Sequence, residues 1–559
     1  MTRPRQTAVS LLASVAVLFA ACIGSTSSGT VRPTPGGAVT IANASGTLWS
    51  CDFSPFNLSE NGDSLGIIYE TLVYDNLLND AKTPWLASSY RWSADSKTLT
   101  FTIRPGVTWS DGQAFSAADV VFTFKMLEAY RALDLESVWN VLSEVTQSGA
   151  DQVVMTFMRP AVPYLYQIAG RTAIVPQHIW SNILNPVSEA VPNPIGTGPF
   201  TAGASACTPQ NITYSRNPHY WQKGLPHLQT VNYPAFIDND VANQYLATGR
   251  AEWGGQFIPN IATSYLAKDQ ASNHYWFPPI HNVDLWFNVT KSPLDNKLVR
   301  RAFAYAIDRS GVSLRGEYGY EPPSNQTGVV TPTFSTWVDT VDAQKYDYKF
   351  DTAKATTLLE QLGFTKNGSG IFEDGSGTKL SFTVINIGGY TDWVASLQVI
   401  QDNLKQAGIE MAVQNLSSSD YFNALYTGNF QLAYGSVATS AGPNPYYELR
   451  NMLHSVTPAD IDPIAAGNFG GFSSKSVDGL FDQFDSTTDP TQQHKLMNQI
   501  QAVMLEDVPV IPVTESVAWY EYSTKRLAGW PTRSDQFAAP APWNLPDMEV
   551  TLLHLYKTG

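Results

Sequence analysis

The segment from Tyr434 to Tyr447 has aromatic, hydroxyl and amide side chains but no acidic residue, the first acid after it being Glu448. Sugar rings present C–H faces that pack on aromatic rings and hydroxyls that hydrogen-bond amides. A desolvated ammonium group instead needs a carboxylate. The segment therefore favours a neutral, hydroxyl-rich ligand, although an acid elsewhere, such as Asp52, could pair with an amine. The alternative is a Pro/Gly loop with packed tyrosines.

Catalytic signatures are absent from the sequence. There is no G-x-S-x-G, H-E-x-x-H, G-x-x-x-x-G-K-[ST] or C-x-x-C pattern, and the eight histidines show no i, i+3 or i, i+4 spacing. The Gly388-Gly389 pair before a predicted helix is too short for a dinucleotide fingerprint and gives only a weak indication of a ligand at the helix N-terminus. We expect no cofactor, no dedicated metal site and no enzymatic activity. A secreted glycoside hydrolase, which would need two facing carboxylates, is the alternative from another class.

Composition narrows the partners and the number of domains. A chain of 559 residues is too long for one core and predicts two or three domains. The net charge of −15 argues against nucleic acid, because phosphate binding needs a basic face.

The N-terminus predicts export. Arg3 and Arg5 precede an apolar run from Ala8 to Ala21, which is too short to span a bilayer permanently. The run ends at Cys22 in a sequence that resembles a bacterial lipobox, with Phe19 in place of the usual Leu. We expect lipidation of Cys22, the alternative being an ordinary cleaved signal peptide.

Two cysteines remain, Cys51 and Cys207. An even pair in an exported protein favours a disulfide, and two separate buried thiols are the alternative.

Local patterns predict the elements that hold these groups. Alternation predicts a strand at Thr98–Ile103, then a turn at Ser110–Gly112 and a helix that Ser116 and Asp119 cap. Strand Leu380–Asn386, helix Thr391–Ala407 and strand Ile409–Val413 form a predicted βαβ unit with parallel strands. We also expect a helix over Leu65–Asn76.

The strand, turn and helix from Thr98 to Leu127 contain R-x-G-V-x-W-x-D-G and S-A-x-D-V-V-F, and G-T-G-P-F follows at Gly196–Phe200. Together with R-N-P-H-Y-W at Arg216–Trp221, they resemble the bacterial extracellular solute-binding proteins of family 5. The G-P-N-P-Y-Y ending at Tyr447 is similar to a loop of the cello-oligosaccharide and β-glucoside binders of that family.

This resemblance runs from about Ala38 to the C-terminus and implies an α/β fold of the two-lobed periplasmic-binding-protein type II-like class, with an inserted subdomain and a two-strand hinge. The implied organisation is a signal peptide (1–21), a flexible tether (22–37), a discontinuous first lobe (38–82, 196–288 and 510–559), its inserted subdomain (83–195) and a second lobe (289–509).

The resemblance implies a monomeric lipoprotein on the outer face of the cell membrane, or a periplasmic protein. It would capture an oligosaccharide by hinge closure and deliver it to an ABC permease and its ATPase. Alternatives are an oligopeptide or dipeptide ligand, and a sensor or adhesion lipoprotein that binds without transport.

Candidate ligand contacts lie near the expected lobe crossings and in the acid-free loop. They are Trp49, Asn57, Trp253, Asn260, Trp286, Asn288, Tyr434, Asn444, Tyr446, Tyr447 and Trp519. Trp393 lies on the apolar stripe of a predicted helix, so we expect it in the core.

Overall fold

The computed structural model describes residues 35–558, apart from 45, 57–63, 347, 437–441, 456–466 and 544. Within these ranges, no helix is long and apolar enough to cross a membrane. Cys22 and Asn57 lie outside the described residues.

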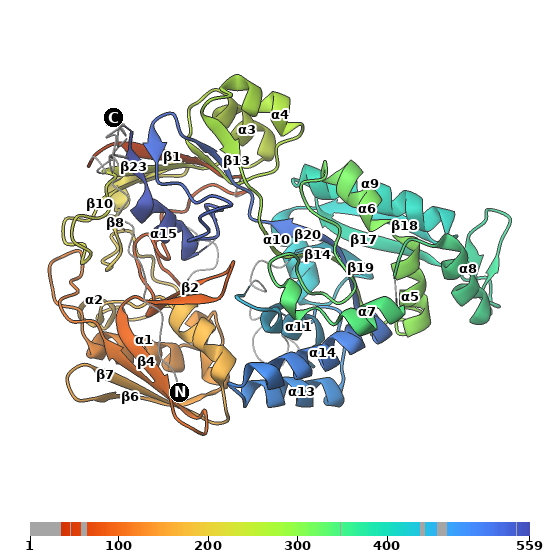
Figure 1. Cartoon of the computed structure of the whole chain (residues 1–559), viewed down its shortest axis with the longest axis horizontal. Coiled ribbons are helices and arrows are strands. Elements are labelled where there is room, and N and C mark those ends of the chain that lie inside the picture. Colours follow the sequence, from red (N-terminus) through yellow and green to blue (C-terminus); the bar gives the residue numbers. More distant parts are fainter. Residues whose placement is uncertain are drawn as a thin grey trace, which may run out of the picture. The chain divides into compact units, whose positions relative to one another are not determined.

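The first lobe is built on a mixed sheet around β1, which pairs in parallel with β11 on one edge and with β12 on the other (Figure 1). A disulfide joins Cys51, in the loop after β1, to Cys207 at the far side of this sheet. The strands in order are β13 (Asn273–Tyr275), β21 (Glu521–Ser523), β12 (Trp253–Gly254), β1 (Ala38–Ala42), β11 (Thr230–Pro234), β10 (Asn211–Arg216) and β8 (Phe200–Thr201), with β9 (Cys207–Thr208) also on β10. Helices α3 (Asn239–Ala247), α4 (Ile261–Ser264) and α15 (Asp547–His554) belong to this lobe.

The expected helix over Leu65–Asn76 is wrong. The segment forms turns and then β2 (Val73–Asn76), which pairs with β3 (Ala81–Pro84). Its backbone bonds a distant segment, since the Gly198 N–H donates to the Ile68 carbonyl at 2.8 Å. A Cβ at Gly196 would lie 1.9 Å from that oxygen, so glycine is required in the G-T-G-P-F sequence.

The inserted subdomain contains the antiparallel sheet β4 (Ala87–Trp92), β5 (Thr98–Ile103), β7 (Gln152–Phe157) and β6 (Leu142–Ser148). β5 alternates buried and half-buried residues, which confirms the predicted strand. Gly112 has φ +87° in the predicted turn. The predicted cap of α1 (Ala117–Ala129) is also confirmed, because the Asp119 carboxylate accepts the Ser116 backbone N–H at 2.8 Å.

The second lobe contains a five-stranded sheet in the order β18 (Glu410–Leu416), β17 (Ser381–Ile387), β19 (Leu432–Gly435), β14 (Pro279–Phe287) and β20 (Val510–Val517). β17 and β18 are parallel and are linked by α9 (Thr391–Gln406), which confirms the predicted βαβ unit. The larger helices of this lobe are α5 (Lys297–Ala306), α6 (Arg309–Gly316), α7 (Thr340–Tyr346), α8 (Thr352–Gln361), α10 (Ser418–Tyr426), α11 (Pro445–Leu453), α13 (Lys475–Asp485) and α14 (Pro490–Asp507).

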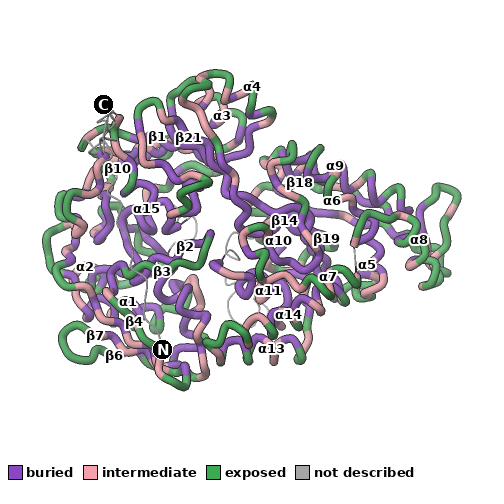
Figure 2. The backbone as a smooth tube through the Cα atoms, in the orientation of Figure 1, coloured by how far each residue is buried: buried purple, intermediate pink, exposed green. Residues whose placement is uncertain are grey.

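The chain passes between the two main sheets at β14 and β20, which pair with each other and are buried along their whole length (Figure 2). Three residues separate β13 from β14, and three separate β20 from β21. The pairing places residues 279–287 and 510–517 in the second sheet, whereas the expected boundaries assign them to the first lobe. Two short connections, 276–278 and 518–520, therefore join the sheets.

Candidate ligand-binding cleft

A cavity of about 390 Å³ lies beside these two connections. This volume falls within the usual range of small-molecule sites, about 300–1,000 Å³. Its wall combines aromatic rings with amide, hydroxyl and carboxyl groups and contains no Lys or Arg among the described residues. The lining residues are Asn43, Ala44, Thr47, Trp49, Tyr233, Asn239, Gly255, Gln256, Phe257, His281, Glu321, Tyr390, Asp392, Trp393, Ser436, Ser516, Trp519 and Trp543.

Trp49 and Tyr233 form one fixed aromatic part of the first-lobe wall. The Trp49 Nε1–H donates to the Tyr233 carbonyl at 2.9 Å, and the two ring centroids are 4.9 Å apart. Asn43 donates from Nδ2 to the Tyr233 hydroxyl at 3.1 Å. Both rings are thus held before a ligand arrives, which reduces the entropy lost on binding.

A glycine pair positions the next part of this wall. A Cβ at Gly255 would lie 2.5 Å from the Pro542 side chain, so only glycine permits this approach. The Gly255 carbonyl accepts the Trp543 Nε1–H at 3.2 Å. Phe257 follows and packs edge-to-face on Trp519, with centroids 5.7 Å apart. The chain directly after β12 therefore orients two indoles of the cavity.

The N-terminus of α9 supplies the second-lobe wall. Tyr390 is its N-cap and packs edge-to-face on Trp393, with centroids 4.9 Å apart. A Cβ at Gly435 would lie 2.7 Å from Trp393 Cζ3, so glycine makes room for the indole. Trp393 is 8% exposed, and that exposed fraction borders the cavity. The expectation that Trp393 belongs to the core is therefore incomplete, because the ring is both packed and part of the lining.

Two buried carboxyl groups and one buried imidazole line the cavity. Burial raises the pKa of Glu321 to about 8 and that of Asp392 to about 6. The Glu321 Oε2 accepts a hydrogen bond from the Thr514 hydroxyl at 2.8 Å. Burial lowers the pKa of His281 to about 4, so its imidazole is neutral at pH 7. The described lining therefore presents acids and no cation at neutral pH.

Of the predicted contacts, Trp49 and Trp519 line the cavity, whereas five others have contacts elsewhere. Trp253 is fully buried, and its Nε1–H donates to the Pro540 carbonyl at 2.9 Å. Trp286 packs on Phe469, with centroids 5.1 Å apart. Asn260 is the N-cap of α4, Asn288 Nδ2 donates to the Gly428 and Phe430 carbonyls, and Tyr434 is buried in β19.

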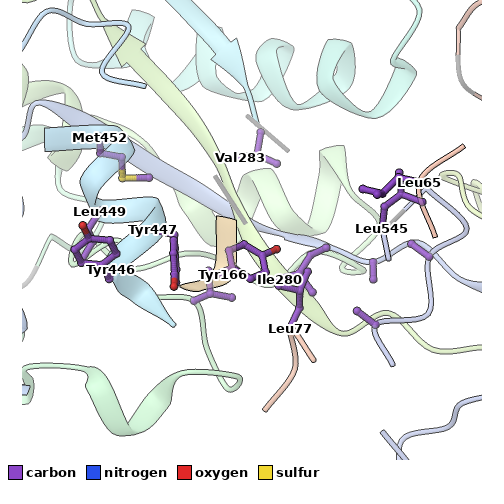
Figure 3. Packing of buried hydrophobic residues seen from close by; sticks show 14 of the residues in the cluster. Leu65, Leu77, Tyr166, Ile280, Val283, Tyr446, Tyr447, Leu449, Met452 and Leu545 are labelled. Atoms are coloured by element: carbon purple, nitrogen blue, oxygen red, sulfur yellow. The ribbon is translucent and has the colours of Figure 1, made fainter. Parts of the chain in front are cut away.

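The C-terminal part of the acid-free loop contacts the inserted subdomain. Asn444 caps α11, and the Tyr447 hydroxyl donates to the Pro163 carbonyl at 2.8 Å. Figure 3 shows Tyr447 beside Tyr166, and their centroids are 5.1 Å apart. The Tyr446 hydroxyl donates to Asp485 at 2.5 Å. Residues 437–441, in the middle of the loop, lie outside the described residues.

Asp485 also accepts from Arg159 Nη1, in the inserted subdomain, at 2.6 Å. Arg450 Nη2 donates to the Tyr164 hydroxyl at 3.2 Å. We call this group, Arg159, Pro163, Tyr164 and Tyr166 with Tyr446, Tyr447, Arg450 and Asp485, the interlobe contact. It joins the two lobes through residues that do not line the cavity.

Sequence reasoning missed most of the lining, including Gln256, Glu321, Asp392 and Trp543. Two signals were available. Gly254-Gly255 directly precedes Gln256 and Phe257, and Gly388-Gly389 directly precedes the α9 N-terminus. The weak indication of a ligand at that helix start thus coincides with a wall of the cavity.

Comparison with known proteins places this geometry in a family. The chain is 23% identical to the oligopeptide-binding protein OppA of Bacillus subtilis over 479 residues, which cover 82% of this chain and 84% of that protein. It is 25% identical to the glutathione-binding protein GsiB of Escherichia coli over 441 residues, covering 77% and 79%.

A solved structure of a periplasmic oligopeptide-binding protein from Thermotoga maritima, with mannohexaose bound, is 26% identical. It matches with a TM-score of 0.83 over 93% of this chain and 98% of that one. The family model for bacterial extracellular solute-binding proteins, family 5, matches residues 82–459, more than half of the chain. The chain therefore belongs to this family of extracellular solute-binding proteins, which bind substrates for ABC importers and are not enzymes.

Proposed function

We propose that this protein captures a neutral oligosaccharide, of the cello-oligosaccharide or β-glucoside type, for import. The observation that carries the proposal is the cavity lining, which places four indoles beside amides and hydroxyls and has no Lys or Arg among the described residues. Flat aromatic faces suit the C–H surfaces of pyranose rings, and amides suit their hydroxyl edges. The mannohexaose bound to the Thermotoga maritima relative supports the same ligand class.

The orientation of the indoles adds support. Trp49 and Trp543 each donate their Nε1–H to a backbone carbonyl, so the polar edge of each ring is already occupied. What these two rings offer a ligand is their apolar surface. Polar recognition then falls to groups such as Gln256, Asn239 and Ser516. This division suits a ligand with apolar faces and polar edges.

Capture works by closure of the two lobes about residues 276–278 and 518–520. Ligand contacts come from both lobes, with Trp49 and Trp543 on one side and Trp393 on the other. A ligand that touches both walls favours the arrangement in which the walls are close. The closed complex is then the form delivered to the permease and its ATPase.

Calorimetric titration tests the ligand class. We expect cellotriose or a longer cello-oligosaccharide to bind, and Trp393→Ala or Trp519→Ala to weaken binding at least tenfold. Trp337→Ala is the matched control, because this tryptophan stacks on His494 and does not line the cavity. Binding of mixed peptides without any oligosaccharide would overturn the proposal. Equal affinity in all three variants would show that the cavity is not the site.

An oligopeptide is the second candidate, favoured by one observation. Asp392 and Glu321 lie in the wall and could pair with a peptide ammonium group. The OppA relative is named for oligopeptide binding. Tripeptides with free and acetylated N-termini, titrated in parallel with the oligosaccharides, separate the two candidates.

We also propose that the protein is a monomer held to the outer face of the membrane by lipidated Cys22. Radiolabelled palmitate should be incorporated by the wild type and not by Cys22→Ser. Sedimentation of the chain from residue 38 onward should give a single species near the monomer mass.

A further inference from the structure

Among the described residues, the second-lobe wall of the cavity contains two carboxylic acids and no basic group to balance them. Glu321 is 1% exposed and Asp392 is 6% exposed, and both border the cavity. Asp392 Oδ1 is buried without a hydrogen-bond partner among the described residues. No salt bridge within the described ranges includes either acid.

A third acid lies behind these two. The Glu317 Oε1 accepts the Ser396 hydroxyl at 2.6 Å, while its Oε2 has no hydrogen-bond partner in the described structure. Burial, and then the nearby charges of Glu321 and Asp392, raise the pKa of Glu317 well above its usual value. We call these three residues the acid patch. Tyr434 faces it from β19, and its pKa is raised by burial and by the charges of Glu317 and Glu321.

No cation neighbours the acid patch in the part of the chain that the structure describes. The hydrogen-bond donors that contact it are the hydroxyls of Ser396, Thr514 and Ser516 and backbone N–H groups, of Val517 and at the start of α9. The other titratable groups of the cavity wall are His281, neutral at pH 7, and Tyr233 and Tyr390. An anion that entered would lose its water and meet carboxyl groups and neutral donors, with no cation among the described lining residues to balance its charge.

We propose that the acid patch makes the cleft selective for ligand charge: it accepts neutral oligosaccharides, binds those with a protonated amine more tightly, and excludes those with a carboxylate. This proposal rests on the proposed function, because it assigns the charge class of the same ligand. In a neutral complex, Glu321 and Asp392 hydrogen-bond sugar hydroxyls. In an amine complex, they form charge-assisted bonds to the ammonium group.

Proton release provides an independent readout. At pH 7 the Glu321 carboxyl is largely protonated, since its pKa is about 8. A neighbouring ammonium group favours the ionised form, so binding an amine should expel a proton to the solvent, whereas a neutral sugar should expel little. Titration calorimetry in buffers of different ionisation enthalpy measures this proton directly.

The experiment compares three trisaccharides of similar size with the full-length protein at pH 7: cellotriose, the glucosamine trimer and a trimer with a terminal glucuronate. We expect the amine to bind about tenfold more tightly than cellotriose and the glucuronate at least 100-fold more weakly. Glu321→Gln and Asp392→Asn should each reduce the ratio between amine and glucuronate affinity about tenfold. Glu515→Gln is the matched control, since this buried carboxyl of β20 bonds Thr331 and does not line the cavity.

Affinities for the three trisaccharides within threefold of one another would overturn the proposal, as would an amine complex formed without proton release. If Glu321→Gln and Asp392→Asn both melt cooperatively, their affinities test the charge selectivity. If one of them fails to fold, the other variant and the wild-type affinities for the three trisaccharides still test it.

Failure of the proposed function gives a different result. No trisaccharide would then bind, and the charge selectivity would be tested with tripeptides instead. A free N-terminus should in that case bind at least tenfold more tightly than an acetylated one, and equal affinity would refute the charge selectivity.

Discussion

The interlobe contact should control ligand affinity although it does not line the cleft. Arg159 bonds Asp485 at 2.6 Å, and the two side chains are 37% and 2% exposed. Arg159→Met removes this bond and keeps most of the apolar stem. Exposed ion pairs contribute about 0–1 kcal/mol, and breaking a fully buried pair costs about 3–5 kcal/mol. In the variant, Asp485 still accepts the Tyr446 hydroxyl and still lies near the charge of Arg450. We therefore expect the loss of the Arg159 bond to cost about 1–2 kcal/mol.

This free energy belongs to the arrangement in which the two lobes touch. If opening separates Arg159 from Asp485, the variant favours the open form, and ligand must supply the difference. The dissociation constant should rise about 5- to 30-fold, since 1.4 kcal/mol corresponds to a factor of ten. Titration calorimetry measures this change, and a double-mutant cycle with Asp485→Asn isolates the pair.

Lys525→Met is the control for this prediction, because it removes an exposed bond to Asp269 within the first lobe. It should leave affinity unchanged. An unchanged affinity in Arg159→Met, together with a lower melting temperature, would refute this prediction. The bond would then stabilise the open and closed forms of the protein equally.

Three further predictions follow from buried groups. Gly435→Ala should weaken ligand binding at least tenfold and alter tryptophan fluorescence, because the added Cβ would lie 2.7 Å from Trp393 Cζ3. Unchanged binding would contradict this. Gly428→Ala is the control, because it adds a methyl group at a positive φ with open space around the Cβ. The melting temperature should fall as pH rises from about 5.5 to 8.5, because burial raises the pKa of several acids, Glu321 and Glu448 to about 8 among them, so the folded state holds protons that the unfolded state releases. Glu321→Gln should remove one of these protons and make the slope shallower. A variant with the wild-type slope would contradict the raised pKa of Glu321. Replacing Cys51 and Cys207 by Ser should lower the free energy of unfolding by about 3–5 kcal/mol, since the disulfide closes a loop between residues 156 apart. Identical denaturant unfolding curves of the wild type with and without reductant would contradict this prediction.

Local patterns predicted the elements whose two faces differ. β5 alternates because one of its faces is buried, and α9 has an apolar stripe because one side packs on the sheet. The helix prediction for Leu65–Asn76 failed for the converse reason. All of its residues from Leu65 to Asn76 are buried, so its apolar positions show no period that distinguishes helix from strand. Its backbone partners, Gly198 and Phe200, lie far along the chain and leave no local signal.

The candidate site was less accessible to sequence reasoning. Trp49 and Trp519 were found because they lie near the lobe crossings. Glu321 and Asp392 are two of 49 acidic residues, and nothing beside them in the sequence distinguishes them. What gives a carboxyl group its role is desolvation, which depends on tertiary packing. That no Lys or Arg lines the cavity in the described part of the chain is likewise a property of the fold, since a lining assembled from many separate segments cannot be read from any one of them.

The acid-free loop shows how a motif can bear on ligand binding without touching the ligand. Its Asn444, Tyr446 and Tyr447 were predicted as contacts, and the structure places them in or beside the interlobe contact. Ser436, at the other end of the same loop, lines the cavity. One segment thus joins the ligand wall to the surface where the lobes meet. Because closure and binding are linked equilibria, we expect a change at Tyr447 to alter affinity through the closed population even if every cavity side chain stays in place.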